Sequence, residues 1–493
     1  LGPRNSGRFK PNPVATMQGE SRDVRRGRLL RLCATVAVFS VASARRNMRV
    51  ERGLAETHTF LGVNLGGWLL MEDWMWAAEM KNQGVGDEHA LIAKYGGPQD
   101  ERARQVVQTH WDTFLRPHHL DVLRRFGFTH VRIPIGYWLL ENASEAVADG
   151  FVPGGEGFLR RALGWLKARG MKAVLDLHAM PGSQAAHESF TGKRSPVAGF
   201  FLNPEDYDRG QRAVVSLCEL VLRLENSSNT SDTVIGVEPL NEPAHAFWDT
   251  ERGIRNFYEM MVPKIREFLP ADRYMILLSF MESPHVRTAA WFSSARERDP
   301  DNFAGVVYDK HLYHTFGDNK APWSPDMDMC KTCCRDSHIL EPMWSADIPI
   351  IIGEYGLSTG FGGWDQPGFP ASFAENQLSM WDSTPGMVGS FAWNFRILLD
   401  PQDPMMFKEW SWFDLIVSDH LAPDGGLSPR LGGSCTAMTE SDARECPHFD
   451  MHVSWAAPCE WRWLSSAARR GRAVTTLALV GFRWVLVAVG SGW

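Results

Sequence analysis

TVIGVEPLNEP, at residues 233–243, is a short apolar run that ends in polar residues. Continuous apolar segments of this length are typical of strands that are buried on both faces of a parallel sheet. Further runs of this kind lie along the chain between residues 60 and 395, and together with the first they predict eight buried strands. They are FLGVNLGGW (60–68), THVRIP (129–134), KAVLDLH (172–178), YMILLSF (274–280), FAGVVYDKHLY (303–313), IPIIIGEYG (348–356) and GMVGSFAWNF (386–395).

Helix-like segments separate several of these runs. FLRRALGWLKARG, at residues 158–170, carries apolar residues at helical spacing, and Gly170 is placed to end the helix before the next strand. A strand followed by a helix, repeated along the chain, predicts an α/β fold: a closed (β/α)8 TIM barrel with its active site at the C-terminal ends of the strands. An open doubly wound sheet is the alternative, but no G-x-G-x-x-G sequence follows the first strand.

The composition indicates a folded protein that binds a neutral ligand. Of the 493 residues, 44% are hydrophobic and 22% are charged, which is close to ordinary globular usage. The formal net charge is −7 and the body of the chain has no long stripe of lysine or arginine, so nucleic acid is not expected as a partner. The chain has 20 tryptophans, whose flat rings with one polar edge suit stacking against sugars, although most tryptophans serve packing.

The start of the chain resembles a secretory signal. Residues 22–44 combine an arginine-rich start, a short apolar run and an Ala-Ser-Ala cleavage pattern, with Met17 as a natural initiator. We therefore expect residues 1–44 to be upstream residues plus a signal peptide, and the protein to be secreted; an uncleaved membrane anchor is the alternative. Removal of eight basic and two acidic residues with this segment would change the formal charge from −7 to −13, because −7 − 6 = −13. Sequons at Asn142, Asn226 and Asn229 are compatible with glycosylation.

Eight cysteines are present, and Cys33 lies within the signal pattern. In an oxidising compartment most of the others are expected to form disulfides and not a zinc site, because the C-x-x-C pair at 330–333 lacks a second spaced ligand pair. Their number after cleavage is odd, which leaves one thiol unassigned. The expected disulfide cysteines are Cys330, Cys333, Cys334, Cys435, Cys446 and Cys459.

Residues 426–493 form a C-terminal extension without a recognisable binding-module pattern. Its apolar segment at 473–490 follows a basic run and contains Arg483 near its middle. A tail anchor, a lipid-anchor signal and a dispensable tail all remain open, so membrane or cell-wall attachment is one prediction for this region. Otherwise we expect a monomer.

Polar and aromatic side chains gather where the predicted strands end. They are Arg132, His178, Asn241, Glu242, His311, Tyr313, Glu354 and Trp393. Glu242 and Glu354 follow the fourth and seventh strands, so both carboxylates are expected to face one pocket. Two carboxylates beside a glycosidic bond can divide the work of hydrolysis, and a nearby Arg132 would keep one of them ionised. No metal or cofactor is required by this chemistry.

These motifs resemble those of the exo-β-1,3-glucanase (glucan 1,3-beta-glucosidase) branch of glycoside hydrolase family 5. The resemblance covers about residues 58–425 and implies a single catalytic domain with decorated loops at 55–425. The motifs are GVNLGGWLLMEDW (62–74), HVRIPIGYW (130–138), LDLHAMPGSQ (175–184), LNEP (240–243), KHLYHTF (310–316), IGEYG (352–356), SFAWNF (390–395) and EWSW (409–412).

The resemblance implies a retaining hydrolase of β-glucans, exo-acting on β-1,3 linkages, without a cofactor. Glu354 would be the nucleophile and Glu242 the acid/base. The substrate-binding residues that it implies are Glu72, Arg132, His178, Asn241, His311, Tyr313, Phe316 and Trp393.

The chain departs from the family pattern around the expected pocket entrance. Ala179 and Ala185 replace a usual glycine and asparagine, Asp73 replaces a proline, and Lys310 and Leu312 flank His311. Cleavage of a β-glucoside is therefore a firmer expectation than strict β-1,3 selectivity. Two alternatives stay open: a transglycosylase that uses the same site to remodel wall glucan, and a non-catalytic glucan-binding wall protein.

Overall fold

The computed structural model describes residues 59–281, 285–316, 331–359 and 364–421, without the side chains of residues 331, 333 and 334. The chain divides into two compact units, Leu1–Gly53 and Leu54–Trp493, and the described residues all belong to the second. The predicted signal peptide and the C-terminal extension lie outside this description, as do the side chains of the six expected disulfide cysteines. Within it, Cys218 is a buried free thiol. No helix in these ranges is long and apolar enough to span a bilayer.

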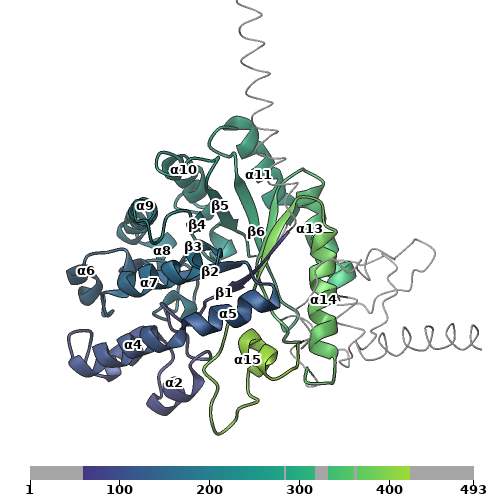
Figure 1. Cartoon of the computed structure of the whole chain (residues 1–493). Coiled ribbons are helices and arrows are strands. Elements are labelled where there is room, and N and C mark those ends of the chain that lie inside the picture. The colour runs from purple at the N-terminus through teal and green to yellow at the C-terminus, as the bar shows by residue number, and fades with distance from the viewer. Residues whose placement is uncertain (1–58, 282–284, 317–330, 360–363, 422–493) are drawn as a thin grey trace, which may run out of the picture. The chain divides into compact units, whose positions relative to one another are not determined.

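Eight parallel strands form a closed barrel in chain order, with β1 paired to both β2 and β8 (Figure 1). The predicted (β/α)8 fold is therefore confirmed. Nearly all strand residues are buried, as expected for strands covered by helices outside and side chains inside. The strands are β1 (Phe60–Asn64), β2 (His130–Gly136), β3 (Lys172–Ala179), β4 (Val234–Glu238), β5 (Met275–Ser279), β6 (Val306–Leu312), β7 (Ile350–Tyr355) and β8 (Met387–Ala392).

Helices follow the strands and surround the barrel (Figure 1). The predicted helix at 158–170 is α7, which begins at Gly155 and ends at Lys167; Gly170 lies beyond its end, in the left-handed region with φ +65°. The helices are α2 (Ala77–Gln83), α3 (Glu88–Lys94), α4 (Glu101–Phe114), α5 (Pro117–Phe126), α6 (Ala143–Ala148), α7 (Gly155–Lys167), α8 (Gly199–Leu202), α9 (Pro204–Glu225), α10 (Ile254–Arg266), α11 (His285–Arg298), α13 (Ser337–Trp344), α14 (Phe369–Asp382) and α15 (Trp412–Val417).

The barrel interior changes from apolar to charged along the strands. Alternate strand residues face inward, so on β6 the inward series is Val307, Asp309 and His311. Val307 belongs to an apolar cluster separate from the main core, and the next inward positions are buried charges. On β3 the same order runs through Val174, Asp176 and His178. The polar groups thus lie toward the C-terminal end of the barrel, above an apolar floor.

Two predicted positions differ in detail. β4 ends at Glu238 because Pro239 has no N–H to continue the ladder, so Asn241 and Glu242 lie in the loop after the strand and not on it. Arg132 is the third residue of β2 and not at its end. Its long side chain nevertheless reaches the same layer as the strand-end residues.

Candidate active site

Arg132 is the centre of the buried polar network. Its Nη1 donates to Glu354 Oε1 at 2.8 Å and to Asn64 Oδ1 at 3.0 Å, and its Nη2 donates to Asn241 Oδ1 at 2.8 Å. Its Nε donates to Glu238 Oε2 at 2.7 Å. The planar guanidinium, carried by β2, therefore fixes side chains from β1, β4, β7 and the loop after β4 in one arrangement, which a single ammonium could not do.

Glu354 receives a donor at each of its carboxylate oxygens. Besides Arg132 at Oε1, the Tyr313 hydroxyl donates to Oε2 at 2.7 Å. Burial raises the pKa of Glu354, the positive charges of His311 and Arg132 oppose this, and the negative charge of Glu242 adds to the rise. The two direct donors favour the ionised carboxylate, because they can bind it with both oxygens as acceptors.

Glu242 lies in a strained backbone conformation. Its φ is +39°, a region that a residue with a side chain rarely adopts, and it precedes Pro243, which restricts it further. Its N–H donates to Ser279 Oγ at 3.3 Å, which ties the loop to the end of β5. Strain of this kind costs about 1–3 kcal/mol and clusters at functional sites. The loop holds the Glu242 side chain, which is 14% exposed, over the barrel mouth.

His311 lies between the two carboxyl groups. Its Nδ1 is 2.5 Å from Glu242 Oε1 and 3.4 Å from Glu354 Oε2. One oxygen of each carboxyl and one nitrogen of His311 all lie within 4.8 Å of one another. Burial opposes the charged imidazolium, but the negative charges of Glu354, Asp309 and Glu242 outweigh it and raise the pKa of His311 well above its usual value. Conversely, although burial would raise the pKa of Glu242, its hydrogen bond with His311 holds that pKa below the ordinary value.

His178 and Trp393 form one wall of the site. His178 Nδ1 donates to Asp176 Oδ2 at 2.6 Å, and its ring stacks on Trp393 with centroids 5.7 Å apart and planes 10° from parallel. The Asn241 amide nitrogen lies 3.4 Å from His178 Nε2. Asn241 is therefore oriented by Arg132 on its oxygen and by His178 on its nitrogen.

Glu72 has one carboxylate oxygen free for a ligand. Its Oε2 accepts a hydrogen bond from Trp74 Nε1 at 2.9 Å, whereas its Oε1 is buried and no described residue offers it a hydrogen bond. Burial raises its pKa to about 7. A buried acceptor without a partner is costly, and the hydroxyl of a ligand would satisfy it.

Phe316 marks an aromatic rim. It is 66% exposed, and its ring lies 5.7 Å from that of Tyr313 and 6.5 Å from that of Trp410. Trp410 in turn packs edge-on against Trp74, with ring centroids 5.3 Å apart. Flat apolar rings around a polar floor are suited to the faces of sugar rings.

The structure brings together the ten side chains that the sequence predicts for the site, with Phe316 at its rim. Sequence reasoning missed the buried acids beneath them, Asp176, Glu238 and Asp309, and also Asn64. One signal could have found two of the acids: in both D-x-H sequences, the aspartate precedes the site histidine by two residues and so shares its inward face.

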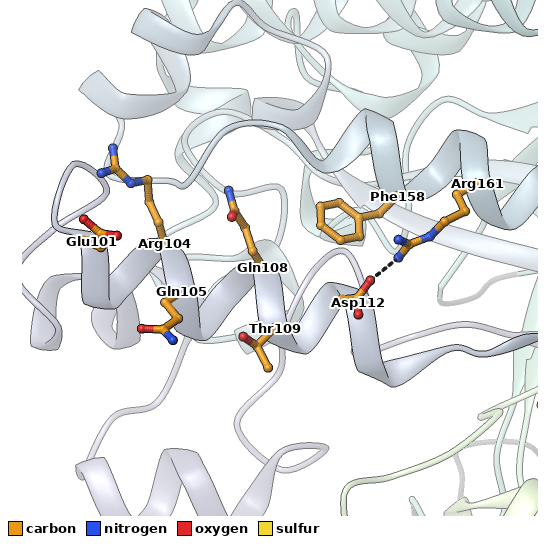
Figure 2. A pocket seen from close by; sticks show the side chains of 8 residues that line it. All are labelled: Glu101, Arg104, Gln105, Gln108, Thr109, Asp112, Phe158 and Arg161. Atoms are coloured by element: carbon orange, nitrogen blue, oxygen red, sulfur yellow. Dashed lines mark hydrogen bonds and ion pairs between the residues drawn. The ribbon is translucent and has the colours of Figure 1, made fainter.

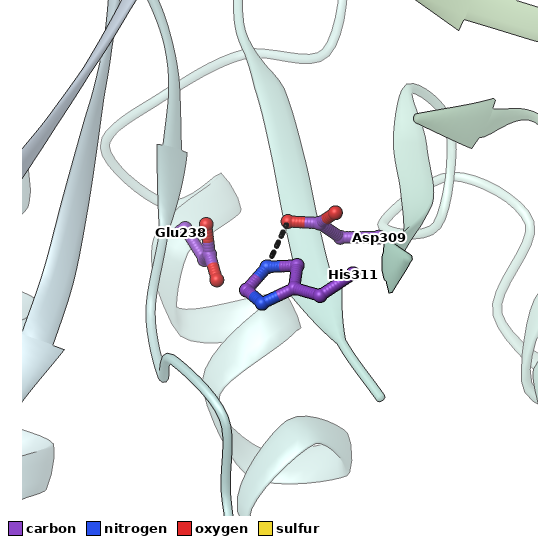
Figure 3. Close-up of side chains that lie close together, drawn as sticks. All are labelled: Glu238, Asp309 and His311. Carbon is purple, nitrogen blue, oxygen red and sulfur yellow. Dashed lines mark ion pairs between the residues drawn. The ribbon is translucent and has the colours of Figure 1, made fainter. Parts of the chain in front are cut away.

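Two groups of side chains have the spacing of metal ligands. They are Glu238, Asp309 and His311 (Figure 3), and Glu242, His311 and Glu354. However, Arg132 already compensates Glu238 and Glu354 with direct hydrogen bonds. A cation would have to displace or face this fixed positive charge, so the donor set does not fit a metal well.

A separate hollow of about 620 Å³ lies on the outside of the barrel, lined by α4 and α7 (Figure 2). Its aromatic residue, Phe158, has the guanidinium of Arg161 over its ring at 5.0 Å and the ring of Trp111 edge-on at 5.5 Å. Arg161 also pairs with Asp112 at 2.7 Å. With these neighbours the ring is not a good sugar platform, and none of the predicted site residues lines this hollow.

The chain is similar in sequence to known proteins. Residues 100–378 match the family model described as Cellulase (glycosyl hydrolase family 5). The chain is 30% identical over 297 residues to a probable glucan 1,3-beta-glucosidase A of Aspergillus fumigatus, which covers 60% of this chain and 64% of that protein. It is 26% identical over 326 residues to a glucan endo-1,6-beta-glucosidase B of Emericella nidulans, which covers 65% of this chain and 74% of the relative. The chain thus spans less than two thirds of the glucosidase's length.

A solved structure supports the same fold. The rutinosidase from Aspergillus niger superposes with a TM-score of 0.59 at 18% identity, covering 73% of this chain and 97% of that one. At this identity the likeness concerns the barrel alone. The family match spans more than half of the chain and includes β4, β6 and β7, which surround the two carboxyl groups. The chain belongs to glycosyl hydrolase family 5.

Proposed function

We propose that the protein is a retaining glycoside hydrolase that cleaves β-glucosidic bonds of glucans, most specifically an exo-acting glucan 1,3-beta-glucosidase. One observation carries the proposal: oxygens of Glu242 and Glu354 approach within 4.8 Å around His311. Retaining enzymes hold their two carboxyls about 5–5.5 Å apart, whereas inverting enzymes need about 6.5–9.5 Å to admit a water. The short approach between these two oxygens supports the retaining assignment.

The two carboxyl groups would act in sequence. Glu354, bound by Arg132 and Tyr313 as a carboxylate, attacks the anomeric carbon, which gives a glycosyl-enzyme ester on Glu354. Glu242 protonates the departing oxygen with the proton of its hydrogen bond to His311, because the pKa of Glu242 is lowered and that of His311 is raised by this pairing. Glu242 then takes a proton from water, and the resulting hydroxide equivalent cleaves the ester. The two steps together return both groups to their starting protonation state, and no cofactor takes part.

The other predicted residues would bind the sugar at the reacting end. Asn241, held between Arg132 and His178, faces the hydroxyl next to the anomeric carbon, and the free oxygen of Glu72 accepts from another hydroxyl. Trp393 lies beneath the first sugar and Phe316 at the entrance, where flat rings suit sugar faces. Cell-wall glucan remodelling or polysaccharide breakdown outside the cell fits the secretory pattern at residues 22–44.

The proposed β-1,3 linkage rests on the similarity of the chain to its relatives. Probable glucan 1,3-beta-glucosidases give the higher identity, and an endo-1,6-beta-glucosidase also matches. Glucose release from linear β-1,3, β-1,6 and β-1,4 glucans should be greatest for the β-1,3 chain, with glucose as the first product. Early release of longer oligosaccharides would contradict exo action, and transfer products at high substrate concentration would favour the transglycosylase.

Glu354→Gln tests the proposed mechanism. It should abolish hydrolysis of a β-1,3-glucan while leaving its binding, and NMR of the wild-type reaction should detect the β-anomer first. Glu267→Gln, at an exposed position outside the site, is the matched control. Full activity of Glu354→Gln, or α-anomer as the first product, would disprove the retaining assignment. Binding without any product from the wild type would instead support a non-catalytic glucan-binding protein.

A further inference from the structure

Three buried polar atoms face one another beneath the two carboxyl groups. They are Glu238 Oε1, Asp309 Oδ2 and His311 Nε2 (Figure 3). One oxygen of each carboxyl and one nitrogen of His311 lie within 4.8 Å of one another. The three atoms named have no hydrogen-bond partner among the described residues. The shortest printed approach is 3.7 Å, between His311 Nε2 and Asp309 Oδ2. Two of these atoms are carboxyl oxygens, and a proton on His311 Nε2 lets this nitrogen face the carboxylate of Asp309 without opposed lone pairs.

Asp309 has its orientation fixed by the next strand. Its Oδ1 accepts the backbone N–H of Gly353 at 2.7 Å, which leaves Oδ2 directed to the imidazole. A Cβ at position 353 would lie only 2.3 Å from Asp309 Oδ1, so only glycine leaves room for this carboxylate. Gly353 immediately precedes Glu354, and the register of β6 and β7 shifts between Lys310 and His311. The strand that carries Glu354 is therefore shaped around Asp309.

We propose that Asp309 is a positioning residue that keeps a proton on Nε2 of His311, so that Nδ1 and Glu242 Oε1 share the one proton that Glu242 gives to the departing oxygen. The inference rests on the proposed hydrolase function. When the glycosidic C–O bond breaks and the bond to Glu354 forms, this proton moves to the departing oxygen. When water cleaves the ester, one proton of this water restores the hydrogen bond between His311 and Glu242.

The charges around His311 are consistent with this arrangement. Glu242 and Glu354 face its Nδ1 from the loop after β4 and from β7, and Asp309 and Glu238 face its Nε2 from β6 and β4. Positive charge reaches the cluster through Arg132, which binds both Glu238 and Glu354. Lys310 points elsewhere, with its ammonium bonded to the carbonyls of Phe280 and Met281. Because carboxyl groups outnumber positive charges here, a proton is favoured on Nε2 of His311, and a second proton is favoured between Nδ1 and Glu242.

Asp309→Asn should reverse the tautomer. Because the Gly353 N–H fixes an acceptor oxygen on one side, the amide NH2 would face His311 and donate to Nε2. Neutral His311 then carries its proton on Nδ1. This N–H donates a hydrogen bond to Glu242, which stays an ionised carboxylate. The variant loses its acid but keeps its nucleophile.

The test compares leaving groups. Asp309→Asn should lose about 100-fold in kcat/KM on a β-1,3-glucan, whose departing oxygen needs a proton, but less than about threefold on 2,4-dinitrophenyl β-glucoside, which does not. The pH above which the variant loses activity on the glucan should also be lower than for the wild type. Asp336→Asn, which removes a carboxylate from another buried histidine, His314, is the control and should affect both substrates alike. Equal losses on both substrates for Asp309→Asn would overturn the proposal.

A second measurement does not depend on activity or on the variant. ¹⁵N NMR of the histidine side chains of the wild type, with the His311 signals identified by their loss in His311→Gln, should show Nε2 protonated from pH 5 to 8. An unprotonated Nε2 would refute the role of Asp309 even if Asp309→Asn fails to fold. If the wild type cleaves neither substrate, the proposed function fails, while the NMR result still decides the tautomer.

Discussion

The guanidinium of Arg132 lies 2.8 Å from a carboxylate oxygen of Glu354, although 222 positions separate the two residues in the chain. The same guanidinium also holds Glu238 and Asn241. It therefore acts on the charge of Glu354 and on the geometry of the loop that carries Glu242.

Arg132→Lys should reduce kcat/KM on a β-1,3-glucan by about 100-fold or more, because an ammonium keeps the charge but cannot make these divergent hydrogen bonds. The melting temperature should also fall, since buried Glu238 and Asp176 lose a partner. Arg209→Lys, at a more exposed ion pair with Glu141, is the control and should retain activity. Activity of Arg132→Lys within threefold of the wild type would show that charge alone suffices.

Tyr313→Phe removes the hydroxyl that donates to Glu354 Oε2. A hydrogen bond to a charged group contributes about 1.5–3 kcal/mol, so kcat should fall by roughly 10- to 100-fold while KM changes little. Steady-state kinetics provide the measurement. Tyr95→Phe, which removes a hydroxyl bonded to Glu79 away from the site, should leave kcat unchanged. A change confined to KM would place Tyr313 in substrate binding instead.

Phe316→Ala should raise KM for glucan oligosaccharides severalfold and leave the melting temperature unchanged, because its ring is 66% exposed and contributes little to the core. Val286→Ala, at a comparably exposed position, is the control for thermal stability. An unchanged KM for oligosaccharides of every length would exclude Phe316 from the sugar path.

Glu88 makes stability depend on pH. Burial raises its pKa to about 8, and its Oε2 accepts the N–H of Met71. A carboxyl whose pKa is higher in the folded state stabilises the fold fully below its unfolded value of about 4.5, and this contribution is lost as pH rises toward 8, by about 1.4 kcal/mol per pKa unit at most. Glu88→Gln, which stays neutral, should therefore gain in melting temperature relative to the wild type between pH 5 and pH 9. Glu101→Gln, at an exposed position, should follow the wild type, and a constant difference for Glu88→Gln would contradict the assignment.

The eight strands could be predicted because each lies in a mostly apolar run that ends in polar residues. The candidate site followed from the same pattern, since strand ends of a barrel share one rim. Asn241 and Glu242 lie beyond the strand because β4 ends at Glu238, before Pro239, which has no N–H to continue the ladder.

The buried acids could not be predicted in the same way. Asp309 and Glu238 are charged residues within strands, where sequence patterns lead one to expect a boundary or an exposed position. Their hydrogen-bond partners lie on other strands. Their partners, Gly353 and Arg132, are distant in sequence. The approach of Glu242 and Glu354 to within 4.8 Å likewise depends on barrel curvature and loop conformation, which no local pattern contains.

Closure of the barrel by β1 and β8 also determines when the site can exist. Asn64 on β1 donates to the carbonyl of Gly353 on β7, 289 positions later, and accepts from Arg132. During synthesis the ribosome must therefore release almost the whole domain before the first strand finds these partners. Contacts between such distant positions form late in folding because their loop-closure entropy is large. Recovery of hydrolysis after dilution from denaturant should therefore lag behind the recovery of helical signal, so enzymatic turnover would report the last step of assembly.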